Sequence, residues 1–488
     1  MTQEDHEEES ELASALGWGG FASLVNLVGM VAFGKVVGLV LGPIGEGYAA
    51  QLVAHSRLFA SPLSVVGGPA LVSNLAPALA SGDQERASTT LQTATTLAAV
   101  MTPILVLLGT VVWSWNNENP ALASTVLVAM ALMAAAADIT HNVPKQTLVA
   151  SGSLNAVGRT IAGVAVAGAT AGCVLVGAFG LWGYFVTPLV TASVATIAYV
   201  RTIRVVTPSL RFYPLKVDRG IAGDMVRVSM AQFSQLAAES LGMTLVYQTI
   251  RSEAPMSGDL LAGYFAAAWA LGRTNISVVM QGVGLFIYPR YAAASSNQAV
   301  LHEIRRGCNM LQGMALGLFI AAAAVREPLI MIVKSAEYLP AATLFGFMLV
   351  VDLSRLMNIL HGSALLYRKH NAAYAFMALS TWTIFVTAAF VLVPRFGLTG
   401  IAGAYALSFG TNIVLTSILM TRLIGRPNLA YLPRLLLSVG VLSVVIYTTT
   451  STSWWISACW TVVGLGTASV SPLGKLLLGK VRQKLLRS

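Results

Sequence analysis

The chain has 488 residues, of which 56% are hydrophobic and only 10% are charged, and its mean hydropathy is +0.72. A soluble domain usually carries about 25% charged residues on its surface. The composition therefore excludes a soluble globular protein and predicts an all-α polytopic membrane protein. The net charge of +10 does not call for nucleic acid as a partner, because membrane topology explains where the charges lie.

The acidic residues 1–11 predict a cytoplasmic tail. Apolar segments follow along the whole chain, each about 20 residues or longer, which is enough to cross a hydrocarbon core of ~30 Å. We expect about 14 transmembrane helices, at roughly 17–41, 46–79, 88–115, 121–143, 155–178, 181–206, 224–250, 260–288, 299–325, 338–366, 371–393, 398–421, 430–449 and 454–478.

The loop charges predict the orientation of these helices. Most of the 30 Lys and Arg residues fall in the even-numbered loops and in the C-terminal tail. The odd-numbered loops hold only Arg251, Arg326, Lys334 and Arg395. Because cytoplasmic loops carry the excess of Lys and Arg, this bias places both termini in the cytoplasm.

An internal repeat divides the chain into halves. The segment GYAAQLVAHSR (Gly47–Arg57) recurs as GYFAAAWALGR (Gly263–Arg273), with Gly, Tyr and Arg at matching positions. FGLWG at 179–183 likewise recurs as FGLTG at 396–400. We therefore expect two six-helix bundles related by a pseudo-two-fold axis along the membrane normal. The predicted domains are 12–206 and 224–421, a basic cytoplasmic linker at 207–223, and helices 13 and 14 with a basic tail at 422–488.

Arg57 and Arg273 each lie some 10–14 residues from the outer end of a predicted helix, or roughly 15–20 Å at 1.5 Å per residue. A central arginine costs about 2.5–3.5 kcal/mol of insertion free energy, and its planar fork suits phosphate. We therefore predict a cationic site for an anionic, phosphate-bearing substrate, with an ion pair within the protein as the alternative. Lys35, near the outer end of helix 1, either joins this site or extends its ammonium group to the interface.

The predicted helix 7 carries a polar stripe of Gln232, Gln235 and Glu239 at near-helical spacing. Such a stripe on an apolar helix is typical of a wall that faces water or a polar substrate. We therefore add the three residues to the candidate substrate-binding set. Glu239 has three candidate roles, which are to pair with an arginine, to carry a coupling proton or to bind a cation.

Helices 4 and 10 contain further charged residues in the membrane. Asp138 lies on the predicted helix 4, and Asp352 and Arg355 lie on helix 10 at an i,i+3 spacing that predicts a local salt bridge. We consider these three residues candidates for coupling or gating. Asp138, Glu239 and Asp352 are the carboxylates that we assign to the membrane-spanning segments.

The sequence contains no motif of a known enzyme class. HExxH, paired CxxC, GxSxG, Walker A and clustered aspartates are all absent, so we predict no catalytic residue, no metal site and no cofactor. Cys173, Cys308 and Cys459 lie in apolar surroundings and are expected to be structural thiols.

Three segments resemble bacterial polysaccharide flippases of the Wzx type, in the MOP superfamily, which also contains lipid II flippases and MATE exporters. LGPIGEGYAAQLVAHSRLFASPLSVVGGPALVSNLAPALASGD resembles the first helical hairpin, GYFAAAWALGRTNISVVMQGVGLFIYPRYAAAS the eighth helix, and PRFGLTGIAGAYALSFG the entry to the twelfth. The resemblance covers residues 12 to 425 and is spread along the chain rather than concentrated in one motif.

The resemblance implies a flippase of the bacterial inner membrane, which moves undecaprenyl-diphosphate-linked oligosaccharide from the cytoplasmic to the periplasmic leaflet by alternating access. It further implies a proton or sodium ion as coupling ion, contacts with membrane lipids, and a polysaccharide polymerase and glycosyltransferases as partners. In related lipid II flippases, arginines on helices 1, 2 and 8 engage the diphosphate. Arg57 and Arg273 match helices 2 and 8, whereas helix 1 offers only Lys35. The alternatives are a lipid II flippase, a cation-coupled multidrug exporter, and a membrane scaffold for polysaccharide synthesis that transports nothing.

Overall fold

The structure is a computed structural model that describes residues 3–116, 122–254, 257–294, 296–425, 432–450 and 454–470. Every regular element in these ranges is a helix. Residues pack into two compact units, Met1–Leu245 and Val246–Ser488. Helix α7 runs across the division between them.

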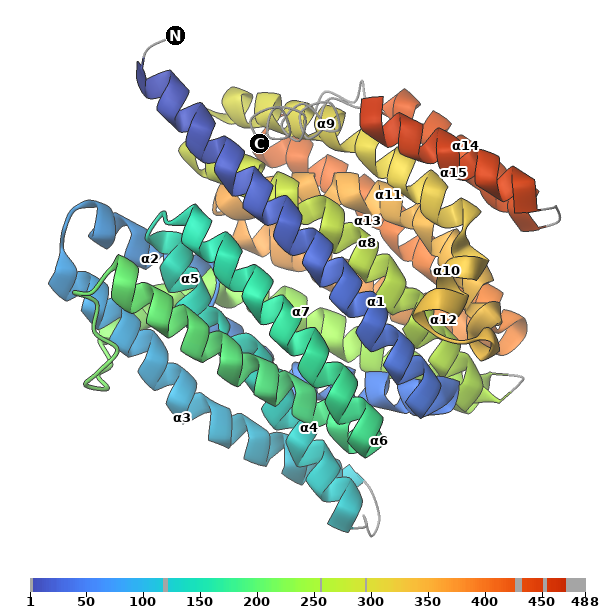
Figure 1. Cartoon of the computed structure of the whole chain (residues 1–488), viewed down its shortest axis with the longest axis horizontal. Helices are drawn as coiled ribbons and strands as arrows, with labels where there is room; N and C mark the ends of the chain where they lie inside the picture. Colours follow the sequence, from blue (N-terminus) through green and yellow to red (C-terminus); the bar gives the residue numbers. More distant parts are fainter. Residues whose placement is uncertain are drawn as a thin grey trace. The chain divides into compact units, whose positions relative to one another are not determined.

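The first unit is built from long helices that lie along one another (Figure 1). Its elements are α1 (Gln3–Ala60), the 3-10 helix η1 (Ser61–Val65), α2 (Pro69–Ala80), α3 (Gln84–Asn116), α4 (Leu122–Thr140), α5 (Asn142–Ala150), α6 (Leu154–Val206) and the first part of α7 (Arg219–Glu253). Helices α1, α3 and α6 each pack against α4. Helix α1 begins at Gln3, so residues 3–11 of the predicted tail are helical.

Two of these helices change direction at a glycine with positive φ. Gly42 of α1 has φ 61° and ψ 179°, and Gly180 of α6 has φ 55° and ψ −128°. Side chains other than glycine rarely adopt such angles. Each of the two helices therefore consists of two segments. Those of α6 correspond to predicted helices 5 and 6. Those of α1 correspond to predicted helix 1 and to the first part of predicted helix 2, whose remainder is interrupted and forms η1 and α2.

The second unit contains α8 to α15. Its elements are α8 (Gly258–Ala293), α9 (Asn297–Ala324), α10 (Arg326–Val333), η2 (Ala336–Tyr338), α11 (Leu339–Tyr367), α12 (Asn371–Phe396), α13 (Leu398–Leu423), α14 (Leu432–Thr450) and α15 (Trp454–Val470). Helix α11 packs against α8, α9, α13 and α14. It is therefore the central helix of this unit.

The predicted internal repeat has a counterpart in backbone geometry. Gly397, which joins α12 to α13, has φ 55° and ψ −126°, nearly the angles of Gly180. Three residues after each of these turns comes another glycine with no room for a side chain. A Cβ atom on Gly183 would lie 1.9 Å from Leu175 O, and one on Gly400 would lie 2.4 Å from Leu392 O. The FGLxG sequences thus build the same tight helical hairpin in both units.

Eight stretches of the described residues are long and apolar enough to span a membrane. Two of them, Leu27–Leu79 and Ala156–Val206, contain 53 and 51 residues and are long enough to cross twice. Together with α7, α8, α14 and α15, they confirm the predicted all-α polytopic fold of about 14 transmembrane helices. Residues 471–478 of the last predicted helix, and the basic tail after them, lie outside the described residues.

Helices α14 and α15, which follow the repeat, pack on α9 (Figure 1). The contact between α9 and α15 is formed by glycines. A Cβ atom on Gly317 would lie 2.5 Å from Gly464 O, and one on Gly464 would lie 2.6 Å from Gly317 O. Small residues allow such close approach of two backbones, which is the main source of helix association in lipid.

Of the predicted basic linker 207–223, residues 207–218 join α6 to α7 within the first unit, and residues 219–223 begin α7. The linker is held to α3 by hydrogen bonds. Gln92 Nε2 donates to Tyr213 O at 3.1 Å, and the Asp218 backbone N–H donates to Thr93 Oγ1 at 3.1 Å. The linker therefore covers one end of α3.

Candidate functional site

Arg57 forms an ion pair with Asp138. Arg57 lies in the last turn of α1 and Asp138 lies near the end of α4, and their Nη2 and Oδ2 atoms are 3.5 Å apart. The two side chains are 33% and 51% exposed, so neither charge is sealed inside the unit. The structure thus brings together Arg57, a predicted substrate-binding residue, and Asp138, a predicted coupling residue. The contact is the ion pair within the protein that the sequence analysis gives as the alternative for Arg57.

Two interruptions of helical structure meet next to this pair. After Ala60 the chain forms η1 and a turn before α2 begins at Pro69, and α4 is separated from α5 at His141. A Cβ atom on Gly67 would lie 3.5 Å from Ile139 O and 3.5 Å from Asn142 Cβ. The two breaks therefore touch each other.

Two more basic side chains surround Asp138. His141 follows it by three residues, at the break between α4 and α5, and Lys145 follows it by seven residues, on α5. Both lie close enough for their charges to interact with the Asp138 carboxylate. Lys145 and His141 were not among the predicted site residues, although their helical spacing from Asp138 was a signal in the sequence.

Gln232 of α7 lies at the same break, between η1 and α2. Its Oε1 atom lies 3.0 Å from the position that a Cβ atom would take on Gly68. This oxygen is buried and accepts no hydrogen bond from the described residues. Gln235 and Glu239 follow on α7 and are half-buried. The structure therefore places Gln232, of the predicted polar stripe, against the break.

Lys35 belongs to a different helical segment from Arg57. It lies on α1 before the turn at Gly42 and is half-buried. Glu46, which follows that turn, is only 6% exposed and lies within electrostatic range of Tyr184 on α6. The three carboxylates that the sequence analysis assigns to the membrane do not include Glu46, which is the first residue of the predicted helix 46–79 and lies inside α1.

In the second unit, Asp352 and Arg355 form the predicted i,i+3 salt bridge, with Nη1 and Oδ1 3.8 Å apart. Tyr405 of α13 completes a triangle: its hydroxyl donates to Asp352 Oδ1 and accepts a hydrogen bond of 3.0 Å from Arg355 Nη1. The guanidinium lies 4.8 Å from the Phe409 ring centroid and 5.4 Å from that of Trp269. Cation–π contacts of this kind stabilise a charge away from water.

A buried polar network continues from this triangle along α11 and α13. Asn358 Nδ2 donates to Asn412 Oδ1, and Asn412 Nδ2 donates to Thr381 Oγ1 on α12. Thr416 Oγ1 donates to Asn412 Oδ1 at 3.1 Å. The sequence prediction did not include this network. Its signal was the spacing of Tyr405, Ser408, Asn412 and Thr416 along one face of α13.

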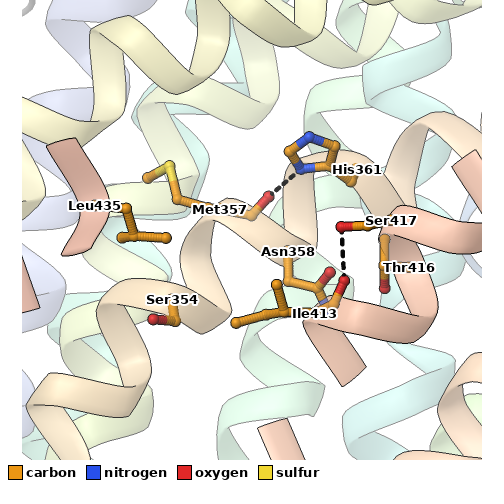
Figure 2. A pocket seen from close by; sticks show the side chains of 8 residues that line it. All are labelled: Ser354, Met357, Asn358, His361, Ile413, Thr416, Ser417 and Leu435. Carbon is orange, nitrogen blue, oxygen red and sulfur yellow. Dashed lines mark hydrogen bonds between the residues drawn. The ribbon is translucent and has the colours of Figure 1, made fainter. Parts of the chain in front are cut away.

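A small pocket opens beside the network, as Figure 2 shows. His361 and Met357 of α11 line it together with Thr416 and Ser417 of α13 and Leu435 of α14. His361 Nδ1 lies 2.8 Å from Met357 O, a distance that fits an N–H donor on Nδ1. The pocket has polar groups on one side and an aliphatic side chain of α14 on the other.

Arg273 lies on α8 and its side chain is exposed. The residue before it, Gly272, packs against the triangle, because a Cβ atom there would lie 2.9 Å from Asp352 Oδ2. That oxygen is buried and accepts no hydrogen bond from the described residues. Arg273 therefore lies on the helix that contacts the buried Asp352 carboxylate, but it is not one of the residues of the Asp352, Arg355 and Tyr405 triangle.

No family model matches the chain, and no curated protein sequence matches it. Solved structures do match. An inward-facing multidrug resistance MATE family transporter of the MOP superfamily is 14% identical, with a TM-score of 0.62 over 88% of this chain and 100% of that chain. An outward-facing one is 12% identical, with a TM-score of 0.64 over 89% of this chain and 96% of that chain.

A third similar structure is a MOP superfamily transporter from Pyrococcus furiosus, described by a reverse polarity of its binding pocket that suggests a different function. It is 14% identical, with a TM-score of 0.59 over 90% of this chain and 97% of that chain. At these identities the likeness establishes the fold, which is that of the MATE transporters of the MOP superfamily.

Proposed function

We propose that the protein is a flippase that moves undecaprenyl-diphosphate-linked oligosaccharide units from the cytoplasmic to the periplasmic leaflet by alternating access, for surface polysaccharide biosynthesis. The observation that carries the proposal is the pair of arginines at repeat-related positions, Arg57 and Arg273, on helices of a transporter fold. Both side chains remain accessible, being half-buried and exposed respectively. A guanidinium binds a phosphate through two parallel hydrogen bonds, so both side chains are suited to a diphosphate.

The surroundings of Arg57 fit a diphosphate better than a cationic drug. The basic side chains of Lys145 and His141 lie within electrostatic range of the Asp138 carboxylate in the ion pair. Gln232 and Gln235 on α7 offer amides of the kind that bind sugar hydroxyls. The similar structure from Pyrococcus furiosus is described by a reverse polarity of its binding pocket, so transporters of this fold differ in pocket charge. Together these features support an anionic, glycan-bearing substrate.

We place the protein in the bacterial inner membrane, as the resemblance to polysaccharide flippases implies, and we place both termini in the cytoplasm from the loop charges. A proton or sodium gradient would drive the cycle, with Asp138, Glu239, Asp352 and Arg355 as the candidate coupling or gating residues. Glycosyltransferases would act before it, to build the oligosaccharide unit, and a polysaccharide polymerase would act after it. A lipid II flippase remains the nearest alternative, since its substrate carries the same diphosphate.

Multidrug export is the second candidate, because two of the similar structures are described as multidrug resistance transporters. The buried carboxyl of Asp352 and that of Glu46 favour it, since a cationic drug needs an acidic partner. Neutralising Glu46 or Asp352 in an exporter would abolish drug resistance and leave the glycan unchanged. A flippase would show the opposite dependence, on the two arginines.

The experiment is a complementation assay of surface polysaccharide in the producing bacterium, with membrane levels of each variant measured by immunoblot. Arg57→Ala and Arg273→Ala are each expected to abolish the polysaccharide while the protein still accumulates. Arg201→Ala, which removes an exposed arginine from α6, is the matched control and should retain it. Normal polysaccharide from both accumulated arginine variants would refute the diphosphate site.

A further inference from the structure

The connection between α6 and α7 carries exposed apolar side chains. Tyr213 is 70% exposed, Leu215 is 49% exposed and Val217 is 47% exposed, and all three lie outside the helices. The loop charges predict two other connections on the same side of the first unit, residues 81–83 and 151–153, and these contain only Ser, Gly and Asp. The apolar content of residues 209–219, which we call the strap, therefore differs from that of a loop surrounded by water.

The strap is fixed along one face of α3. Four polar side chains of this helix, each four residues after the one before, contact successive strap residues. The contacts, given as strap residue and helix residue, are Ser209 with Gln84 at 2.7 Å, Arg211 with Ser88 at 3.4 Å, Tyr213 with Gln92 at 3.1 Å and Lys216 with Thr96 at 3.2 Å. In three of them the strap contributes a backbone N–H or C=O group. The helix therefore satisfies backbone groups that an irregular segment cannot satisfy by itself.

The length of α3 places the strap at the boundary of the membrane. The apolar stretch Gln84–Trp115 has 32 residues, whereas a hydrocarbon core of ~30 Å needs about 20. Trp115, at the far end, is 86% exposed, and tryptophan is enriched at the membrane interfaces. Counting about 20 residues back from Trp115 reaches Thr96. The part of α3 that holds the strap, from Gln84 to Thr96, therefore lies at the level of the lipid headgroups.

Two side chains anchor the strap to the first unit. Leu210 is buried and Phe212 is half-buried against the apolar cluster that contains Leu71 of α2 and Leu91 of α3. The other residues of the strap are exposed. Because the segment is held by hydrogen bonds to α3 and by these two side chains, its exposed residues form a defined surface.

The exposed surface of the strap is basic as well as apolar. Arg211, Lys216 and Arg219 are its cations, and Asp218 is its acidic residue. Asp218 caps α7, because its Oδ1 atom accepts a hydrogen bond of 2.9 Å from the Ile221 backbone N–H. Three basic residues and one acidic residue leave a net charge of +2 on the strap. Basic side chains mixed with apolar ones at a membrane boundary are typical of a segment that binds anionic lipid.

We propose that the strap is a binding surface for anionic phospholipids of the adjacent leaflet. Arg211, Lys216 and Arg219 bind the phosphate groups, and the apolar side chains of the strap lie among the upper parts of the acyl chains. The exposed leucine and valine favour lipid over a nucleic acid, whose phosphates would engage only the cations. The inference is independent of the transported substrate, because it uses only the membrane-spanning fold and the surface of one unit.

The test uses the full-length protein in nanodiscs of phosphatidylcholine that contain a small fraction of a photoreactive lipid. This lipid carries a diazirine at the upper end of its acyl chain and has either a phosphatidylglycerol or a phosphatidylcholine headgroup. Pepsin is used for digestion, so that loss of arginine or lysine does not change the cleavage, and labelled peptides are identified by mass spectrometry. Labelling of the exposed apolar residues between 100 and 111 of α3 is the internal reference. Relative to it, phosphatidylglycerol is expected to label the strap about tenfold or more in excess of phosphatidylcholine.

The first variant removes the cations of the strap. Arg211→Gln with Lys216→Gln and Arg219→Gln should reduce the preference for phosphatidylglycerol by about tenfold to a hundredfold, which is the range for three basic residues near an anionic surface. A rise in ionic strength should also reduce the preference of the wild-type protein, because exposed charges are screened beyond about 8–10 Å. A preference that survives the triple substitution would overturn the proposal.

A matched control removes the same charge elsewhere. Arg305→Gln with Arg306→Gln and Arg422→Gln neutralises three exposed arginines of the second unit and should leave the preference of the strap unchanged. An equal reduction in both triple variants would overturn the proposal, because the lipid would then respond to the net charge of the protein alone.

The apolar side chains are tested separately. Leu215→Ser with Val217→Ser should lower labelling of the strap by both lipids severalfold, because less apolar surface then enters the acyl chains. Unchanged labelling in this variant would overturn the insertion of the strap.

Competitors distinguish the lipid from other anions. Inorganic phosphate or a short RNA, added at constant ionic strength, should leave the labelling by phosphatidylglycerol unchanged. Its loss with phosphate would assign the surface to a free anion, and its loss with RNA would assign it to a nucleic acid. Either result would overturn the proposal, as would equal labelling of the wild-type strap by the two lipids.

Discussion

Replacing Tyr405 by Phe is expected to destabilise the second unit by removing one hydroxyl from its centre. That hydroxyl donates to Asp352 Oδ1 and accepts from Arg355 Nη1 at 3.0 Å, so two hydrogen bonds to charged groups are lost. The ring itself stays in place, because its contacts with Phe409 and Phe385 do not involve the oxygen. No cavity forms, and the change therefore reports on the polar contacts alone.

The size of the effect follows from the environment. Hydrogen bonds between membrane helices average about 0.6 kcal/mol each, whereas bonds to charged groups in proteins contribute about 1.5–3 kcal/mol. The Asp352 side chain is 1% exposed, and after the substitution its partner among the described residues is Arg355, at 3.8 Å. We therefore expect a loss of about 2–3 kcal/mol in the free energy of unfolding, nearer the charged value.

The assay is SDS-induced unfolding in mixed micelles, with the same substitution at Tyr213 as the control. Tyr213 lies in the linker and is 70% exposed, so Tyr213→Phe should change the free energy of unfolding by less than about 0.5 kcal/mol. Combining Tyr405→Phe with Asp352→Asn should cost less than the sum of the two single effects, because the residues share one hydrogen bond. A Tyr405→Phe effect no larger than the control would refute the reasoning.

The remaining predictions concern stability. Gly180→Ala places a side chain at φ 55° and ψ −128° and should lower the free energy of unfolding by about 1–3 kcal/mol. The control Gly177→Ala, whose Cβ would meet no atom within 4 Å, should cost nothing measurable. Thermal unfolding in detergent compares the two variants, and equal melting temperatures would contradict the turn geometry. Arg326 is 2% exposed and donates hydrogen bonds to Thr449 and, at 2.9 Å, to Ala323 O. Arg326→Met should therefore lower the free energy of unfolding by roughly 2–4 kcal/mol. An unchanged midpoint of SDS-induced unfolding would show that these hydrogen bonds contribute little.

The sequence was sufficient for the helices and their repetition. Apolar runs of about 20 residues must form helices in a bilayer, because the backbone has no other source of hydrogen bonds there. The repeated FGLxG segments also identified equivalent hairpins, and Gly180 and Gly397 have nearly the same angles. These features depend on local sequence, and local sequence was therefore enough to predict them.

The site depended on contacts that local sequence does not specify. Asp138 contacts Arg57 of another helix, and the break at His141 decides which side chains surround it. The pairing of Asn358 with Asn412 is of the same kind, since it joins α11 to α13. Polar stripes in the sequence indicate which residues share one face of a helix. Helix packing determines which residue of another helix each of them contacts.

The most direct test of the central claim is translocation in proteoliposomes. A fluorescent polyprenyl-diphosphate oligosaccharide is placed in one leaflet, and its arrival in the other is followed by quenching, with a cationic dye as the competing cargo. The account predicts that the wild-type protein moves the diphosphate lipid and not the dye, and that Arg57→Ala and Arg273→Ala move neither. Transport of the dye by the wild type, with the diphosphate lipid left in its original leaflet, would contradict it.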